Sequence, residues 1–330
     1  MGSLVTILVP LKGRTNFTYR LLAQLNTVKL KFPIFIADGS IYKDFTETRL
    51  KNKYKQINIE YKKFKYDKEF KDFINKIIFF LKKIKSKYIF FLPNDDFLNP
   101  KFIDNAIEIF KSKKDVTVVS GEVINFNVKN QFFNDNSLGM FKILGSQYKQ
   151  KNKSIKDDLI FKRVKKYGQL FPWETLIEKK ILQKIFNIAK LANCKNYHEL
   201  NWLYNTLPLI YGKKIKLNTV SILRQNNTIT GSGKTLFFND VDYEKVNKII
   251  LNKYIKKELK KLKLSKKNIN KIIDEISVSI EKQKKRFKLI NKDENITKNI
   301  FKDIIYSVQK KQNLKNKDHE IKELISKIIF

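Results

Sequence analysis

Lys87-Tyr-Ile-Phe-Phe-Leu-Pro-Asn-Asp-Asp-Phe-Leu-Asn-Pro100 is the stretch that decides the fold of this 330-residue chain. Its apolar run, Tyr88 to Leu92, has the continuous hydrophobic pattern of a strand that is buried on both faces. Two adjacent carboxylates, Asp95 and Asp96, follow the run, and in open α/β sheets ligands bind at the carboxyl ends of strands. Two neighbouring acids repel each other unless a cation or ligand donors offset their charge. The stretch therefore predicts a core strand that ends in a metal site.

Strand-like and helix-like patterns alternate on both sides of this stretch. The short apolar runs that we expect to be strands cover residues 4–9, 32–37, 57–61, 88–92 and 115–121. Segments with helical spacing of apolar residues lie between several of them, which is typical of βαβ units. The pattern predicts an α/β fold with a Rossmann-like, mostly parallel sheet flanked by helices. Three of the strands end at Pro10, Asp38 and Asn94-Asp95-Asp96, so these groups are expected to converge at one edge of the sheet.

The composition limits the kind of metal site that the chain can build. Hydrophobic residues make up 42% of the sequence, which is enough for a large core. The single cysteine, Cys194, excludes a disulfide framework and a cysteine-based zinc site. Only two histidines, His198 and His319, are present, so a histidine-rich centre is excluded as well. Any metal must be held by oxygen, which points to Mn2+ or Mg2+ as the cofactor.

The formal net charge of +37 is the most extreme property of the chain. Only six of the 69 basic residues are arginine, and the lysine, asparagine and isoleucine that are abundant here share AT-rich codons. Because base readout in DNA relies on arginine, we expect no specific nucleic-acid partner. A lysine-rich surface still favours anions such as nucleotides, pyrophosphates or an acidic membrane face.

Three fragments in a fixed order resemble a known family of enzymes. They are Val9-Pro10 followed by Lys12 and Arg14, then Ala37-Asp38-Gly39-Ser40, then Phe91-Leu92-Pro93-Asn94-Asp95-Asp96-Phe97. Together they resemble nucleotide-sugar glycosyltransferases of the GT-A fold and are similar to the inverting family 2 enzymes. The resemblance covers residues 4–125 well and residues 160–230 loosely. It implies transfer of a sugar to a glycan or glycolipid hydroxyl, as in the synthesis of bacterial surface polysaccharides.

The resemblance also implies roles for individual residues. The expected donor-binding set is Pro10, Lys12, Arg14, Asp38, Ser40 and Asp95. Asp96 is expected to hold the divalent cation, which would neutralise the diphosphate as it leaves. The chain departs from the family at Asn94, because the motif often begins with an acid and an amide adds no charge.

The acceptor side has fewer clear signals. An inverting transferase needs a carboxylate that takes the proton of the acceptor hydroxyl. Glu199 is our first candidate for this base, because it lies at a helix start where related enzymes carry theirs, and Glu174 is its rival. Arg224 lies at the basic end of a predicted strand at 212–225 and is a candidate for phosphate or acceptor binding, together with Trp173 and His198.

The composition changes near residue 238. We expect a catalytic domain at 1–238, with a donor half at about 1–125 and an acceptor half at about 126–238, and a lysine-rich helical region at 239–330. The expected helices of that region cover 246–262, 269–287 and 296–329. It either packs on the catalytic domain or rests on anionic lipid. No apolar run approaches the ~20 residues that span a bilayer, so we expect a cytoplasmic protein that is peripheral to the membrane at most.

Two other functional classes stay open. A nucleotidyltransferase also combines acids with a parallel sheet, although its usual glycine-rich N-terminal loop is reduced here to the single Gly13. A non-enzymatic binder of polyanions or nucleic acid is supported by the charge alone.

Overall fold

The computed structural model describes residues 3–128, 141–147, 154–156, 158–165, 173–225, 242–292 and 324. Its strands form one sheet in the order β3-β2-β1-β4-β8-β6-β9-β5, and β7 pairs with β6. The strands are β1 (Val5–Leu11), β2 (Ile34–Asp38), β3 (Ile59–Lys63), β4 (Tyr88–Phe91), β5 (Asp96–Leu98), β6 (Val116–Val128), β7 (Phe141–Gln147), β8 (Thr175–Glu178) and β9 (Lys213–Gln225). The helices beside the sheet are α1 (Thr15–Thr27), α2 (Glu47–Lys53), α3 (Phe70–Lys83), α4 (Pro100–Ser112), α5 (Ile160–Lys165), α6 (Lys179–Leu191) and α7 (Tyr197–Tyr211).

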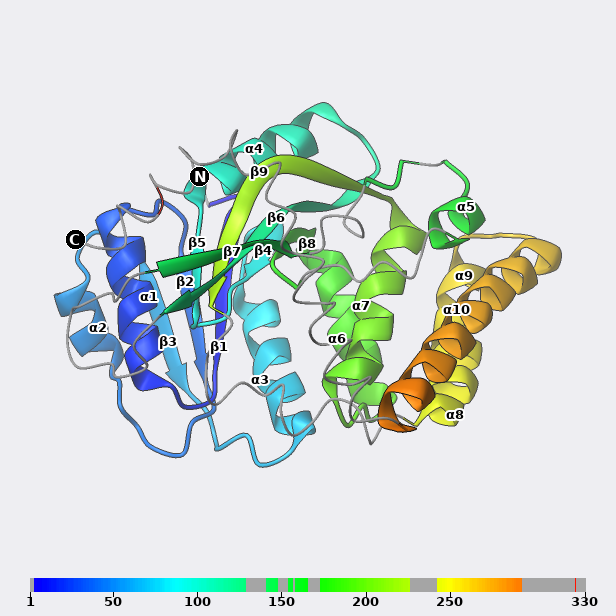
Figure 1. Cartoon of the computed structure of the whole chain (residues 1–330), viewed down its shortest axis with the longest axis horizontal. Coiled ribbons are helices and arrows are strands. Elements are labelled where there is room, and N and C mark those ends of the chain that lie inside the picture. The colour runs from blue at the N-terminus through cyan, green and yellow to red at the C-terminus, as the bar shows by residue number, and fades with distance from the viewer. Residues whose placement is uncertain are drawn as a thin grey trace.

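Strands β3, β2, β1 and β4 form the parallel half of the sheet, as the sequence predicts. Helices cover both of its faces (Figure 1). Ile7 and Val9 of β1 point into a core shared with α1, α2 and α4, whereas Leu8 points into a core shared with α3, α6 and α7. Because β1 is buried on both sides, its sequence is apolar at successive positions and does not alternate.

The other half of the sheet is mixed in direction. β8 lies antiparallel between β4 and β6, β9 runs parallel to β6, and β5 runs antiparallel to β9. The apolar residues Leu176, Ile177, Ile181 and Leu182 together predict a helix from the sequence, and this prediction is wrong for the first two. Both lie on β8, and the helix α6 begins only at Lys179. β4 and β6 pair with this short apolar run on its two sides, and this pairing favours a strand. Over four residues, the spacing of apolar residues cannot distinguish a strand from a helix.

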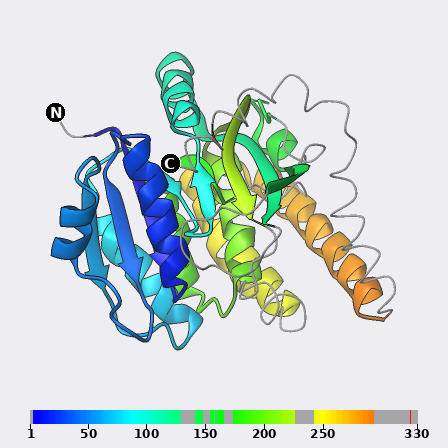
Figure 2. The ribbon, with the colours of Figure 1, turned by 60° about the vertical axis from the view of Figure 1, so that its left-hand side comes forward.

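The C-terminal helices pack against α5, α6 and α7. They are α8 (Tyr243–Lys245), the π-helix η1 (Val246–Ile255), α9 (Lys256–Lys261) and α10 (Lys266–Lys292). The isoleucine stripe of α10 is buried, namely Ile269, Ile272, Ile273, Ile276 and Ile280. In Figures 1 and 2, α6 and α7 lie between these helices and the parallel strands. Among the described helices none has the length and apolar character needed to span a bilayer. The predicted boundary near 238 and most of the third expected helix fall outside the described residues.

Candidate active site

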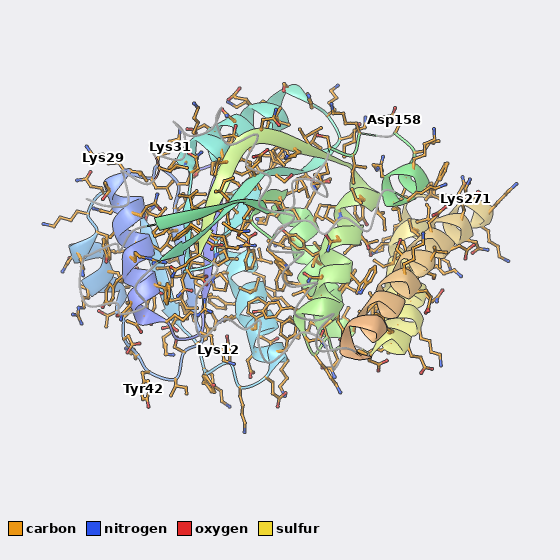
Figure 3. All side chains as sticks on the ribbon, in the orientation of Figure 1. Lys12, Lys29, Lys31, Tyr42, Asp158 and Lys271 are labelled. Atoms are coloured by element: carbon orange, nitrogen blue, oxygen red, sulfur yellow. The ribbon has the colours of Figure 1, made fainter. Side chains whose placement is uncertain are left out.

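The carboxyl ends of β1, β2 and β4 are joined by hydrogen bonds and one ion pair. The backbone N–H of Gly13, after β1, donates to Oγ of Ser40, after β2, over 2.7 Å. Arg14 Nη1 lies 2.5 Å from Oδ2 of Asp95, after β4. Lys12 and Tyr42, labelled in Figure 3, mark the edge of the molecule where β1 and β2 end. The structure thus brings together residues that the sequence predicts to converge.

The loop after β1 owes its shape to two left-handed residues. Gly13 has φ 73° and Arg14 has φ 62°, and Arg14 is also the N-cap of α1. Glycine adopts such a φ without steric strain, whereas in arginine the Cβ atom makes this conformation unfavourable. The Arg14 carbonyl accepts a hydrogen bond from Nδ2 of Asn94 over 3.1 Å, and the same amide donates to Thr18 Oγ1 over 3.0 Å. Asn94 therefore holds the loop in place.

Asp38 is buried, and both of its carboxylate oxygens have partners. Ser40 N donates to Oδ1 over 2.8 Å, and the Tyr61 hydroxyl donates to Oδ2 over 2.7 Å. Lys63 Nζ lies 3.8 Å from Oδ1. Through these partners Asp38 holds the turn at 38–40 in place. Its expected role in binding the donor stays a prediction.

A buried ion pair supports the same turn, and no sequence pattern indicates it. Lys76 of α3 donates to the Leu11 carbonyl over 2.6 Å and forms an ion pair with Asp67. Burial lowers the pKa of Lys76 and raises the pKa of Asp67. The Asp67 carboxylate also fills the space that a side chain on Gly39 would occupy. Glycine is therefore required at 39 for this close approach.

A second group of charges forms around Asp96, the residue that follows Asp95. Asp96 faces Arg224 across the β5–β9 pairing, with Oδ2 at 3.3 Å from Nε and 3.4 Å from Nη2. Arg224 Nη2 also forms an ion pair with Oε1 of Glu174. The other oxygen, Oε2 of Glu174, is buried and has no hydrogen-bond partner. Burial raises the pKa of Asp96 well above its ordinary value, and the neighbouring Arg224 opposes that shift.

Arg20 completes this arrangement and was missed in the sequence. It donates to the Asp95 carbonyl over 3.1 Å, and its guanidinium carbon lies 4.6 Å from the centre of the Phe97 ring. Burial lowers the pKa of Arg20 to about 10, opposed by Asp95 and Asp96. Its one sequence signal is that it is an arginine in an arginine-poor chain. We call the whole group the strand-tip cluster: Arg14, Arg20, Asp95, Asp96, Glu174 and Arg224.

The strand-tip cluster, as arranged, does not fit a divalent cation. Asp96, the predicted metal ligand, has a side chain only 2% exposed and already faces a guanidinium. A cation would have to displace Arg224 from an acid whose ionised form burial disfavours. In the described part of the chain, no group of three or more His, Cys, Asp or Glu side chains is placed to hold a metal ion.

Glu199, our first candidate for the base, pairs with Lys245 of α8 and not with a residue of the strand-tip cluster. It is 1% exposed, and its Oε2 lies 2.6 Å from Nζ of Lys245 and accepts a hydrogen bond from the backbone N–H of Lys195 over 3.0 Å. Burial, with Glu199 as a further cause, raises the pKa of the neighbouring Cys194 to about 12. The structure brings the rival, Glu174, to Asp96 and Arg224.

The remaining predicted residues lie around this region. Trp173 stacks on Tyr204 with ring centres 4.2 Å apart and donates to Asn201, which fixes the residue before Glu174. Lys12 is exposed over the Tyr66 ring, and Pro10 pairs with Ala37 within the sheet. His198 is the second residue of α7, but its side chain lies outside the described residues.

Comparison with known proteins identifies the fold. No family model and no curated protein matches the chain. A structure of S. aureus TarS 1–349 in complex with UDP-GlcNAc matches with a TM-score of 0.53 at 13% identity, covering 83% of this chain and 71% of that one. A longer S. aureus TarS chain matches with a TM-score of 0.52 at 13% identity, and the match covers 84% of this chain but 43% of that chain.

TarS is a glycosyltransferase of GT-A type, so the class that these matches define for this chain is the GT-A-like fold. The α/β fold class predicted from the sequence is thereby confirmed. At 13% identity, the similarity shows a shared fold.

Proposed function

We propose that this protein is a glycosyltransferase that moves a sugar from a nucleotide-sugar donor to the hydroxyl of a glycan or lipid-linked acceptor, with inversion. The observation that carries the proposal is the convergence of Arg14, Asp38 and Asp95 at three strand ends of a GT-A-like sheet. Ligands of open α/β folds bind at this edge. The UDP-GlcNAc held by the similar TarS structure supports a donor of the same chemical class.

The donor in this proposal lies along the strand ends. The Asp38–Ser40 turn borders the base, with Pro10 and Lys12 beside it, and Asp95 contacts the ribose. Arg14 and Arg224 face the diphosphate, because guanidinium groups bind phosphate oxygens in a bidentate manner. Trp173 and His198 border the acceptor.

Glu174 is the base that we propose for the transfer. Its Oε2 is buried without a hydrogen-bond partner, so this oxygen can accept the proton of the acceptor hydroxyl. Glu199, in contrast, forms an ion pair with Lys245. The proton moves to Glu174, and the hydroxyl oxygen forms a bond to the anomeric carbon. The bond from that carbon to the diphosphate breaks, and its electron pair leaves with the nucleoside diphosphate. The guanidinium of Arg224 stabilises the negative charge that develops.

A donor screen tests the function. The purified chain is incubated with UDP-, GDP- and CMP-sugars, and the released nucleotide and sugar are identified. Release of the free sugar with its nucleotide, together with a rise in melting temperature on adding that nucleotide, is expected. Formation of pyrophosphate from a nucleoside triphosphate and a sugar phosphate would instead make the chain a nucleotidyltransferase. Stabilisation by heparin alone, lost at high salt, would make it a polyanion binder.

A lipid-linked acceptor would bring the protein to the inner face of a membrane. The C-terminal helices turn their isoleucines inward, and Lys266 and Lys271 are among the exposed lysines. We propose that this lysine-rich surface rests on anionic lipid, where each lysine contributes ~1 kcal/mol. Flotation with vesicles containing phosphatidylglycerol should recover the protein, and recovery should fall with rising salt. Equal recovery with neutral vesicles would reject the contact.

A further inference from the structure

We infer that this protein binds the diphosphate of its donor through Arg14 and Arg224 in place of a divalent cation. The inference rests on the proposed function, since it concerns the leaving group of that reaction. It reverses the role that the sequence resemblance implies for Asp96. Three independent observations support it: where the chain places its arginines, which charges face outward, and what a cation would displace.

Arginine is placed selectively in this chain. Only six of the 69 basic residues are arginine, and three of those six lie in the strand-tip cluster. Of the other described arginines, Arg49 is exposed on α2 and Arg163 donates to the carbonyl groups of residues 209 and 210. A lysine would supply the same charge, so arginine at this site indicates that its planar, multi-donor geometry is used.

The two outer arginines of the strand-tip cluster reach solvent, and Asp95, the ion-pair partner of Arg14, is 15% exposed beside them. The side chains of Arg14 and Arg224 are 17% and 19% exposed, whereas those of Asp96 and Glu174 are 2% and 4% exposed. A ligand that arrives from solvent therefore meets two guanidinium groups and the Asp95 carboxylate that already pairs with Arg14, whereas Asp96, the acid expected to bind a metal ion, is buried. Exposed guanidinium groups suit a diphosphate, and a buried, arginine-paired Asp96 is poorly placed for a metal ion.

The third observation is that Arg224 already occupies the position that a cation would take beside Asp96. A cation at Asp96 would have to displace Arg224 from both Asp96 and Glu174, with which Arg224 already pairs. A diphosphate requires no such displacement, because a guanidinium has five N–H donors and binds a carboxylate and a phosphate together. Asn94, where the related motif often has an acid, contributes an amide that holds Arg14 O and Thr18.

Calorimetric titration of the full chain with UDP and GDP tests the inference. Each titration is made in EDTA and again with Mn2+. We expect the nucleotide that binds to do so in EDTA with a Kd within threefold of its value in Mn2+, and pyrophosphate to compete with it. Arg224→Met should weaken binding at least tenfold in EDTA, and Arg224→Lys should recover only part of the loss. The control Arg49→Met removes an exposed arginine and should leave the Kd unchanged.

Arg14→Met is the second variant. Its partner Asp95 is partly exposed, so losing the arginine should destabilise the fold less than Arg224→Met does. It should also weaken binding at least tenfold, with a melting temperature near that of the wild type. Binding that appears only with Mn2+, or wild-type affinity in both Arg14→Met and Arg224→Met, would overturn the inference and leave the proposed function standing. If neither nucleotide binds with or without metal, the inference fails, and the donor screen decides separately whether the proposed function stands.

Discussion

The strand-tip cluster and the lysine-rich helices at 242–292 use charge in opposite ways. In the cluster, Arg224 and Asp96 are 128 positions apart in sequence and the acid is 2% exposed. In the helices, Lys248 and Glu244 form an i,i+4 pair whose side chains are both 73% exposed. Exposed pairs of this kind contribute about 0–1 kcal/mol, whereas breaking a buried pair is costly.

The difference shows how to interpret a chain with so much positive charge. Exposed lysines such as Lys248 pair with a neighbour on the same helix and say little about function. The informative charges are the few that are buried and paired across distant strands. The net charge of +37 is therefore a poor guide to the site, and the positions of the arginines are a better one.

The largest expected effect separates the two candidate bases, one inside the cluster and one facing the C-terminal helices. Glu174→Gln should lower turnover about 10³-fold while leaving the Kd of the donor within threefold, because only proton transfer is lost. Glu199→Gln should keep turnover within tenfold. Single-turnover kinetics with titration of the donor measures both. If Glu199→Gln alone abolishes turnover, the base is Glu199 and the chemistry lies closer to the helices.

A pair of substitutions on α3 tests the contrast between buried and exposed pairs. Lys76→Met leaves Asp67 buried without its cation and should lower the free energy of unfolding by about 3–5 kcal/mol. Lys71→Met removes an exposed partner of Glu69 on the same helix and should leave the denaturant midpoint unchanged. Equal midpoints for the two variants would contradict the contrast.

Lys214 on β9 gives a pH-dependent test. Burial lowers its pKa from 10.5 to about 7, so between these values the unfolded chain holds a proton that the folded chain has lost. The wild type should therefore gain stability as the pH rises through this window. Lys214→Met lacks this slope and should be more stable at pH 6, on the order of 2–3 kcal/mol, with the advantage shrinking towards pH 10. Parallel stability curves for the two proteins would reject the shifted pKa.

The smallest expected effect lies within the C-terminal helices themselves. Lys245 reaches the buried Glu199 and the Asn193 carbonyl, so Lys245→Met should destabilise the protein by about 1–2 kcal/mol. Lys248→Met should leave the denaturant midpoint unchanged. Urea titration of both variants measures the difference. A cost for Lys248→Met as large as that for Lys245→Met would mean that exposed lysines of this region matter more than their geometry indicates.

Much of the donor side could be predicted from sequence because its signals are local. Continuous apolar runs marked β1, β2 and β4, and the residues after them, Arg14, Asp38 and Asp95, converge as expected. The features that were missed depend on pairing between distant segments. Nothing in the sequence around Lys76 distinguishes it from the other helix lysines, and β8 is a strand only because β4 and β6 lie on either side of it. Asp96 faces an arginine because β5 pairs with β9, which carries Arg224 128 positions further along the chain.

The strand order also has a consequence for synthesis on the ribosome. β4 is paired by β1 on one side, but its other neighbour, β8, begins only at Thr175. A nascent chain that has emerged only as far as β6 therefore carries the parallel half of the sheet with an open edge, the kind of surface that invites aggregation. We expect truncation products that end before β8 to depend on chaperones, and the polypeptide to become competent for its ligand only after Arg224 has left the exit tunnel.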